Sequence, residues 1–158
     1  MRAGAFEELE FFRSIGASGA RALLIGRRAM VLLGLPVLTA DYDFWIAIDD
    51  ITTFNDAAAT FDLVPTKSAE EARRTGRYVL ENDEHVDVLV ARSVTAHTGE
   101  VAHFDDIWDR RQRVDLSDGV AVNLPTLDDL IITKRFGRRP KDLEDIRLLE
   151  ILKTRSEP

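Results

Sequence analysis

Two aspartates lie one residue apart inside an apolar stretch of the sequence. Asp41 and Asp43 belong to TADYDFWIAI, residues 39–48, which otherwise has the composition of a β-strand. Alternate side chains of a strand share a face, so both carboxylates project from one surface, about 7 Å apart. Like charges so placed must shift their pKa values, stay in water or bind a cation. The pair is therefore a candidate site for Mg²⁺ or Mn²⁺, which prefer carboxylate and phosphate oxygens.

A third acid stands in a second strand-like segment. Asp87 interrupts HVDVLVA, residues 85–91, in which Val86, Val88 and Val90 form one apolar face. If the two strands are neighbours, the three carboxylates form the usual protein half of a two-metal phosphoryl-transfer site. An Asp-x-Asp pair alone is weak evidence, because a single strand-end aspartate is usually a cap, a turn residue or a solvated edge residue.

Groups that could bind phosphate flank these acids. Gly26 stands between a short strand, RALLIG, and a predicted helix, RRAMVLLG, where backbone N–H groups can approach an anion. Further along, KRFGRRPK, residues 134–141, holds five basic residues in a chain of formal net charge −7. This segment is either a solvated helix end or a local site for a polyanion such as a triphosphate.

The composition limits the class of protein. Hydrophobic residues make up 45% and charged residues 31%, and the absence of cysteine excludes disulfides and thiolate metal sites. The acidic net charge disfavours non-specific binding of duplex nucleic acid. The N-terminus lacks a signal peptide's apolar run, and no stretch is long enough to span a bilayer, so we expect a cytoplasmic protein without membrane contact. We expect one domain over residues 1–158, with a core at about 21–125 and C-terminal helices at about 126–155.

Hydrophobic periodicity predicts an α+β (mixed α/β) fold, with a mixed sheet of four to five strands flanked by helices, one face being covered. Two hairpins are expected, one around the NDEH turn and one with Asp118 and Gly119 at its turn. Ser68 should cap a helix with Glu71 three residues later, and a Thr should cap the helix in TTFNDAAATF. Helices are also expected at residues 5–15, 104–112, 126–137 and 141–155.

The order of the motifs resembles the nucleotidyltransferase superfamily, the group related to DNA polymerase β. IGRRAMVLLGLPVLTADYDFWI is similar to its glycine motif at a helix start followed by an Asp-x-Asp strand, and Asp87 takes the place of its later lone acid. LDDLIITKRFGRRPKDLEDIRLL resembles the helical end of the small prokaryotic branch, which includes toxin-like members of toxin–antitoxin and abortive-infection systems. The resemblance covers roughly residues 21–150.

This resemblance implies a Mg²⁺-dependent enzyme that moves a nucleoside monophosphate from an NTP, such as ATP, to an acceptor hydroxyl on RNA, protein or a small molecule. Asp41, Asp43 and Asp87 would bind the metal, and Asp87 would help to deprotonate the acceptor. Lys134, with Arg138, Arg139 or Lys141, would offset charge on the leaving pyrophosphate. The expected nucleotide-binding residues are Gly26, Arg27, Thr39, Arg139 and Lys141. An antitoxin is the partner that the toxin-like relatives imply.

Arg27 departs from the family pattern, which has a second small residue at that position. A guanidinium there either crowds the path of the phosphates or binds them itself. The alternative function is therefore a catalytically impaired nucleotidyltransferase-fold module that binds a nucleotide or a protein. A metal-dependent nuclease, which would need only the carboxylates, is a third candidate. Of the remaining residues, His85 and Trp45 share the face of the acids and could line the site.

Overall fold

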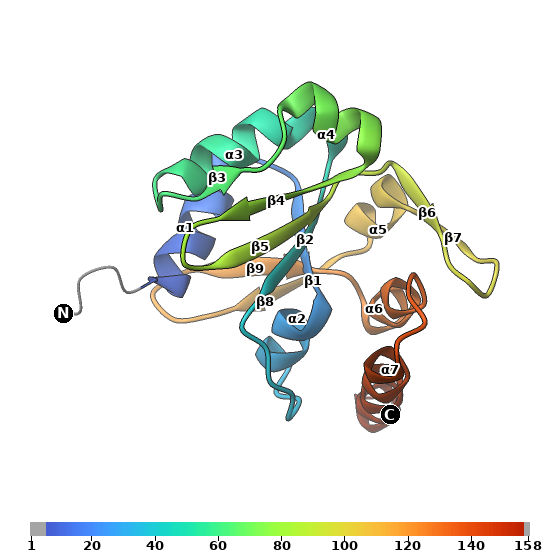
Figure 1. The fold of residues 1–158 in the computed structure, drawn as a ribbon. Helices are drawn as coiled ribbons and strands as arrows, with labels where there is room; N and C mark the ends of the chain where they lie inside the picture. The colour runs from blue at the N-terminus through green and yellow to red at the C-terminus, as the bar shows by residue number, and fades with distance from the viewer. Residues whose placement is uncertain (1–5, 157–158) are drawn as a thin grey trace.

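The structure, a computed structural model, describes residues 6–156 and is built on a five-stranded mixed sheet (Figure 1). The strand order is β1-β2-β5-β4-β3; β2 and β5 are parallel, and the other neighbours are antiparallel. The predicted α+β fold is confirmed. The expected range of residues 1–158, and the first residue of the 5–15 helix, extend outside the described residues. The strands of the sheet are β1 Ala22–Ile25, β2 Tyr42–Ile46, β3 Val64–Pro65, β4 Arg77–Glu81 and β5 His85–Leu89.

Helices cover both faces of the sheet, not the one face that we expected. One face carries the main core with α1 and α3, while Trp45 and Leu23 on the other face pack with Phe104 of α5 and Ile132 of α6. Alternation alone did not predict this second apolar layer, in which Trp45 lies on the same face of β2 as Asp43. None of the described helices has the length and apolar character needed to cross a bilayer. The helices are α1 Glu8–Ser18, α2 Gly26–Leu32, α3 Ile51–Ala59, α4 Ala69–Thr75, α5 Phe104–Asp109, α6 Leu127–Lys134 and α7 Pro140–Ser156.

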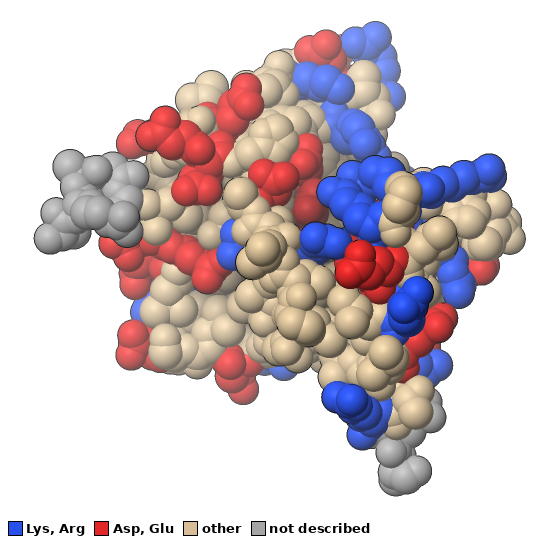
Figure 2. All heavy atoms as spheres, turned by 60° about the horizontal axis from the view of Figure 1, so that its bottom comes forward, with Lys and Arg blue, Asp and Glu red and all other residues tan. Residues whose placement is uncertain are grey.

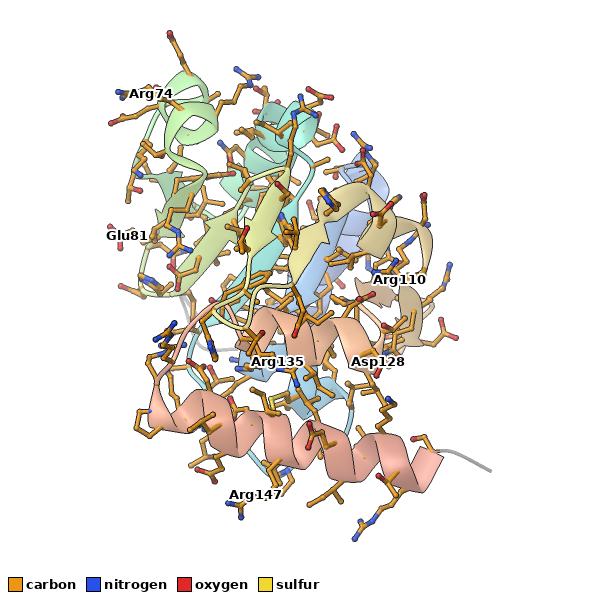
Figure 3. All side chains as sticks on the ribbon, turned by 90° about the vertical axis from the view of Figure 1, so that its right-hand side faces the viewer. Arg74, Glu81, Arg110, Asp128, Arg135 and Arg147 are labelled. Carbon is orange, nitrogen blue, oxygen red and sulfur yellow. The ribbon has the colours of Figure 1, made fainter. Side chains whose placement is uncertain are left out.

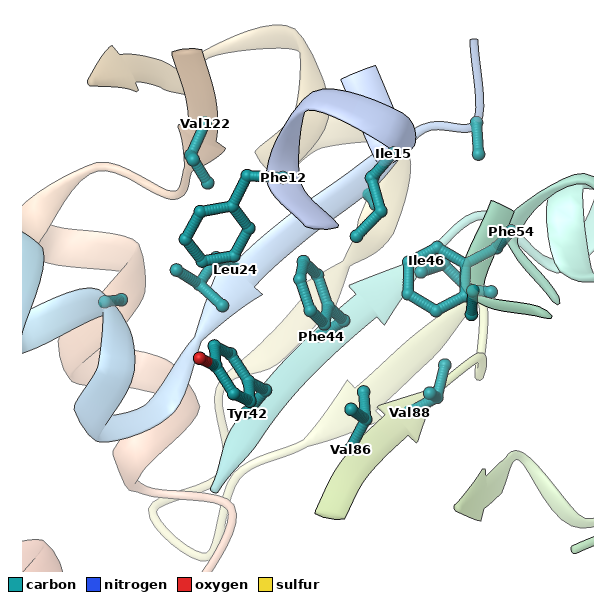
Figure 4. Packing of buried hydrophobic residues seen from close by; sticks show 14 of the residues in the cluster. Phe12, Ile15, Leu24, Tyr42, Phe44, Ile46, Phe54, Val86, Val88 and Val122 are labelled. Carbon is teal, nitrogen blue, oxygen red and sulfur yellow. The ribbon is translucent and has the colours of Figure 1, made fainter. Parts of the chain in front are cut away.

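The main core orients the strand that carries the Asp-x-Asp pair (Figure 4). Phe44 of β2 packs edge to face against Phe54 of α3, with ring centroids 5.2 Å apart, and against Phe11 of α1 at 6.0 Å. Full burial of such a side chain stabilises the fold by roughly 1.5–3 kcal/mol. Because Tyr42 and Phe44 both point into this core, Asp43 between them must point to the opposite face.

Both predicted hairpins are present. Strands β4 and β5 pair directly, and β8 (Gln112–Asp115) pairs with β9 (Ala121–Leu124) through a turn in which Asp118 and Gly119 have φ of 56° and 73°. Positive φ at both central positions is the type I′ pattern. A third hairpin, β6 (Ser93–Thr95) with β7 (Val101–His103), carries no such signal and was not predicted.

One of the two expected helix caps is wrong. The Ser68 hydroxyl does accept the Glu71 N–H, at 3.2 Å, at the start of α4. No threonine caps α3, because a 3₁₀ turn over Ile48–Asp50 leads into the helix and the buried Ile51 is already its first residue.

Candidate active site

Asp43 and Asp87 lie side by side at the centre of the sheet. The parallel ladder of β2 and β5 pairs the two residues directly. Neighbouring strands are about 4.8 Å apart, so side chains at paired positions on one face are adjacent. Both aspartates line a cleft of about 540 Å³ on the face opposite the main core. The sheet therefore brings these two acids of the predicted three together.

The environment of Asp43 opposes its ionisation. Burial raises the pKa of Asp43 to about 6, and the negative charge of Asp87 adds to the increase. Asp41 acts in the same direction, while the positive charges of Lys134 and Arg139 partly counter it. A cation held between the two carboxylates would relieve this repulsion.

Gly26 brings the start of α2 against Asp43. Its φ is 70°, a backbone conformation that favours glycine, and a Cβ added there would lie 2.4 Å from the Asp43 Oδ2. A larger residue would therefore displace the carboxylate. The close approach leaves the first turn of α2 beside the cleft, which Gly26 itself lines.

Lys134 is held in place by a residue that the sequence did not single out for the site. Its Nζ lies 2.8 Å from the Oδ2 of Asp145, and the lysine is 9% exposed while Asp145 is fully buried. Asp145 also accepts two hydrogen bonds from Arg27, at 3.1 and 3.0 Å. Burial alone would raise the pKa of Asp145, but the bonds from Arg27 and Lys134 hold it below its usual value.

Arg139 lines the cleft with its guanidinium bound to Asp142. Two hydrogen bonds of 3.2 Å join the side chains, and Asp142 also accepts the Arg139 backbone N–H at 3.1 Å. Asp142, the third residue of α7, thereby forms half of a capping box. A Cβ on Gly137 would lie 2.8 Å from the Asp142 Oδ2, so a larger residue here would displace that carboxylate.

The structure places the other predicted site residues outside the lining of the cleft. Arg27 turns its guanidinium to Asp145, so it neither crowds the cleft nor reaches into it. Thr39 accepts the Asp41 N–H at 3.1 Å and shapes the turn before β2. Asp41 itself, like Arg138 and Lys141, is exposed and does not line the cleft.

His85 and Trp45 differ in their relation to the acids. The Nε2 of His85 lies 3.2 Å from the Oδ2 of Asp87, and the imidazole side chain is 45% exposed. Trp45 is fully buried and donates its indole N–H to the Ala91 carbonyl at 2.8 Å. Trp45 is therefore a core residue and is not available to stack on a base.

The wall of the cleft on the side of β3 and β4 contains residues that the sequence analysis did not identify. It is formed by the segment from β3 to β4 and includes Thr66, Lys67, Arg77 and Val79. The alternation in RYVLE was a usable signal, because it places Arg77 and Val79 on one face of the predicted hairpin. Figure 2 shows one face of the molecule, on which acidic and basic side chains lie next to each other.

The acidic side chains of the cleft supply some, but not all, of the ligands that a divalent cation such as Mg²⁺ needs. Within residues 6–156, no three His, Cys, Asp or Glu side chains already gather as a metal-ligand group. Asp43 and Asp87 do converge, and Mg²⁺ commonly takes one or two carboxylates with phosphate oxygens and water completing its shell. Burial and the neighbouring charge of Asp87 raise the pKa of Asp43, and a cation bound here would favour its ionised form.

The fold, a mixed sheet with an acid on each of two adjacent parallel strands and a glycine-started helix against them, is nucleotidyltransferase-like. The chain is similar to a crystal structure of a "putative nucleotidyltransferase" from Thermotoga maritima, with a TM-score of 0.59 and 13% sequence identity. The match covers 92% of this chain and 87% of that one. No protein-family model matches the sequence, and no curated protein matches it either.

Proposed function

We propose that the protein is a Mg²⁺-dependent nucleotidyltransferase that transfers a nucleoside monophosphate from an NTP to an acceptor hydroxyl. The observation that carries this proposal is the direct pairing of Asp43 with Asp87 across parallel strands, in a cleft that also contains Gly26 and Lys134. The similarity in fold to a protein described as a "putative nucleotidyltransferase" supports the same reaction class.

Asp43 and Asp87 would hold the metal, joined by Asp41 from the residue before β2. A bound Mg²⁺ would supply charge neutralisation and orientation of the phosphates. The chain's own residues would accommodate the phosphates and offset their charge. Gly26 lets the start of α2 lie against Asp43 in the cleft, and Lys134 and Arg139 would offset the negative charge that develops on the leaving pyrophosphate.

Asp87 would take the proton of the acceptor hydroxyl as its oxygen attacks the α-phosphorus. A general base must lie within hydrogen-bond reach of the proton that it abstracts, and Asp87 lines the cleft in which the phosphates would lie. His85 could then pass the proton to solvent, because its Nε2 lies 3.2 Å from the Asp87 Oδ2 and its ring is partly exposed.

Incubation with labelled NTPs and Mg²⁺ tests the proposal. Label should pass to an acceptor in a cell extract, and Asp43→Ala should reduce this transfer to background. Asp56→Ala is the matched control, because Asp56 is an exposed aspartate on α3. Degradation of nucleic acid without any NTP would instead favour a metal-dependent nuclease, and equal transfer by Asp43→Ala would reject the proposed site.

A second candidate function is a nucleotide- or protein-binding module without transfer activity. It is favoured by the position of Asp41, which is exposed and outside the cleft, so that two acids and not three face it. Calorimetry separates the two candidates. Tight NTP binding with no Mg²⁺-dependent turnover would support the binding module, and turnover would reject it.

A toxin-type role for this transferase rests on the resemblance of the helical tail to toxin-like relatives. If it holds, induced expression of the protein should arrest growth, and Asp43→Ala should abolish the arrest. Co-expression of a neighbouring gene that restores growth would identify an antitoxin partner. Normal growth under strong expression of the active protein would argue against the toxin role.

A further inference from the structure

One face of helix α7 is exposed through the middle of the helix. Figure 3 shows Arg147 projecting from α7 away from α6 and the sheet, whereas Asp145 and Leu149 on the opposite side of the helix are buried. At about 100° of rotation per residue, five exposed positions fall within an arc of about 120°. We name these residues the outer face of α7: Leu143, Glu144, Arg147, Glu150 and Ile151.

Two large apolar side chains of the outer face are in contact with water. Leu143 is 62% exposed and Ile151 is 43% exposed, and each lies about one helical turn from Arg147. Removing such surface from water is favourable. Single apolar side chains are common on protein surfaces, however, so their exposure alone does not identify a partner. The arrangement of the residues around them does.

The outer face has the same pattern in both directions along the chain from Arg147. Glu144 and Glu150 stand three residues before and after it, and Leu143 and Ile151 stand four residues before and after it. If a second α7 packs antiparallel against this face, with a twofold axis at Arg147, Leu143 of one copy comes to the level of Ile151 of the other. An interface between identical chains on a twofold axis needs a patch that complements itself in this way.

The charges of the outer face also complement those of a second copy. Within residues 6–156, Arg147, Glu144 and Glu150 form no ion pair, although both acids stand at the i,i+3 spacing from the arginine. In the antiparallel pair, the two arginines lie at the axis, and the glutamates of both copies surround them. Each guanidinium therefore gains carboxylates that its own chain does not provide. The dipoles of two antiparallel helices are also opposed, which favours this direction.

Leu38 adds exposed apolar surface on one flank of α7. It is 89% exposed, and its carbonyl accepts a hydrogen bond of 3.3 Å from Arg27, whose guanidinium also binds Asp145 of α7. The helix itself has 17 residues, so it is about 25 Å long and about 10 Å wide. This footprint is well below the roughly 800 Å² per partner of a standard stable interface. We therefore expect a weak, concentration-dependent association.

We propose that the outer face of α7 is the docking site for a second copy of this chain, in an antiparallel helix pair with its twofold axis at Arg147. On each side of the axis, Leu143 packs against Ile151 of the second copy. Each Arg147 lies among the glutamates of both copies. The dimer is independent of the proposed reaction, because no residue of the outer face lines the cleft.

Sedimentation velocity of the full chain tests the dimer. The mass of the wild type should rise from monomer to dimer as its concentration increases towards roughly 100 μM. Arg147→Glu puts acids at the axis among the other acids and should weaken the dimer by about tenfold or more. The triple variant Glu144→Arg/Arg147→Glu/Glu150→Arg repeats the pattern with the signs reversed and should restore it. Arg74→Glu is the matched control, because this exposed arginine lies on α4, at the opposite end of the molecule from Arg147 (Figure 3).

Disulfide cross-linking tests the direction of the pair, because the chain has no cysteine of its own. A mixture of Leu143→Cys and Ile151→Cys proteins should form a covalent dimer on oxidation. Leu143→Cys alone should not, since its two copies would lie about 12 Å apart along the helices, beyond the reach of a disulfide. Cross-linking of Leu143→Cys with itself would overturn the antiparallel arrangement. A monomer at every concentration, a dimer that Arg147→Glu leaves unchanged, or a triple variant that stays monomeric would overturn the proposed interface, and the monomer would leave this face to a partner of different sequence.

Discussion

The Oδ2 of Asp145 lies 2.8 Å from the Nζ of Lys134, in the interior between α6 and α7. Burying one charged group costs several kcal/mol unless it is paired, and here a single buried carboxylate pairs with Lys134 and with Arg27 of α2. Through Asp145, helix α7 thereby holds α6 and α2, which both border the cleft, in position. Asp145 is a positioning residue in this arrangement, since Lys134, and not Asp145, lines the cleft beside Asp43.

Removing this carboxylate should be strongly destabilising. Asp145→Ala leaves the buried Lys134 and the largely buried Arg27 without their partner, and we expect a loss of roughly 3 kcal/mol or more in the free energy of unfolding. Urea denaturation measures this loss. Glu144→Ala, which removes an exposed acid from the next position, should change stability by less than about 0.5 kcal/mol. Equal stability of the two variants would contradict the assigned role of Asp145.

Arg27 should behave as a structural residue and not as a phosphate ligand. In Arg27→Ala, Asp145 keeps Lys134 as its partner, so the expected loss of stability is smaller, about 1–2 kcal/mol. Arg27→Lys should recover only part of it, because lysine cannot form the two parallel bonds to the carboxylate. NTP affinity, measured by calorimetry well below the melting temperature, should be unchanged in both variants. A large loss of affinity without a loss of stability would assign Arg27 to the phosphates instead.

The sequence predicted the central acids better than the residues around them. Alternation on two apolar strands was enough to place Asp43 and Asp87 on one face, because a one-residue slip would bury their charges in the core. Nothing in the sequence singled out Asp145 for the site. Its partner Arg27 is 118 residues away, and no periodicity along the chain encodes a contact between distant helices. Asp41 was expected in the site, but the strand begins only at Tyr42, so alternation does not fix the direction of its side chain.

The approach of Gly26 to Asp43 should be intolerant of any side chain. Gly26→Ala adds a Cβ at 2.4 Å from the Asp43 Oδ2 and forces an L-residue to a φ of 70°. The backbone strain alone costs about 1–2 kcal/mol, so we expect a loss of roughly 2 kcal/mol or more together with loss of transfer. Gly16→Ala is the control, since this exposed helical glycine has open space around it. It should gain about 0.5–1 kcal/mol. Equal melting temperatures for the two variants would show that Gly26 does not contact Asp43 so closely.

The raised pKa of Asp43 predicts how stability changes with pH in metal-free protein. Folding raises this pKa from its ordinary value near 3.8 to about 6, so the folded state holds the proton more tightly than the unfolded state. The resulting stabilisation is full below about pH 4 and is lost as the pH rises towards and through 6. Asp43→Asn abolishes the charge, so at pH 8 with a chelator it should be more stable than the wild type by roughly 1–2 kcal/mol. The difference should shrink towards pH 4, where both side chains are neutral in the folded protein. It should also shrink when Mg²⁺ is added at pH 8, because the metal would stabilise only the protein that retains Asp43. If the difference in the free energy of unfolding between the two proteins were the same at every pH, this would contradict the burial of the Asp43 carboxylate beside Asp87.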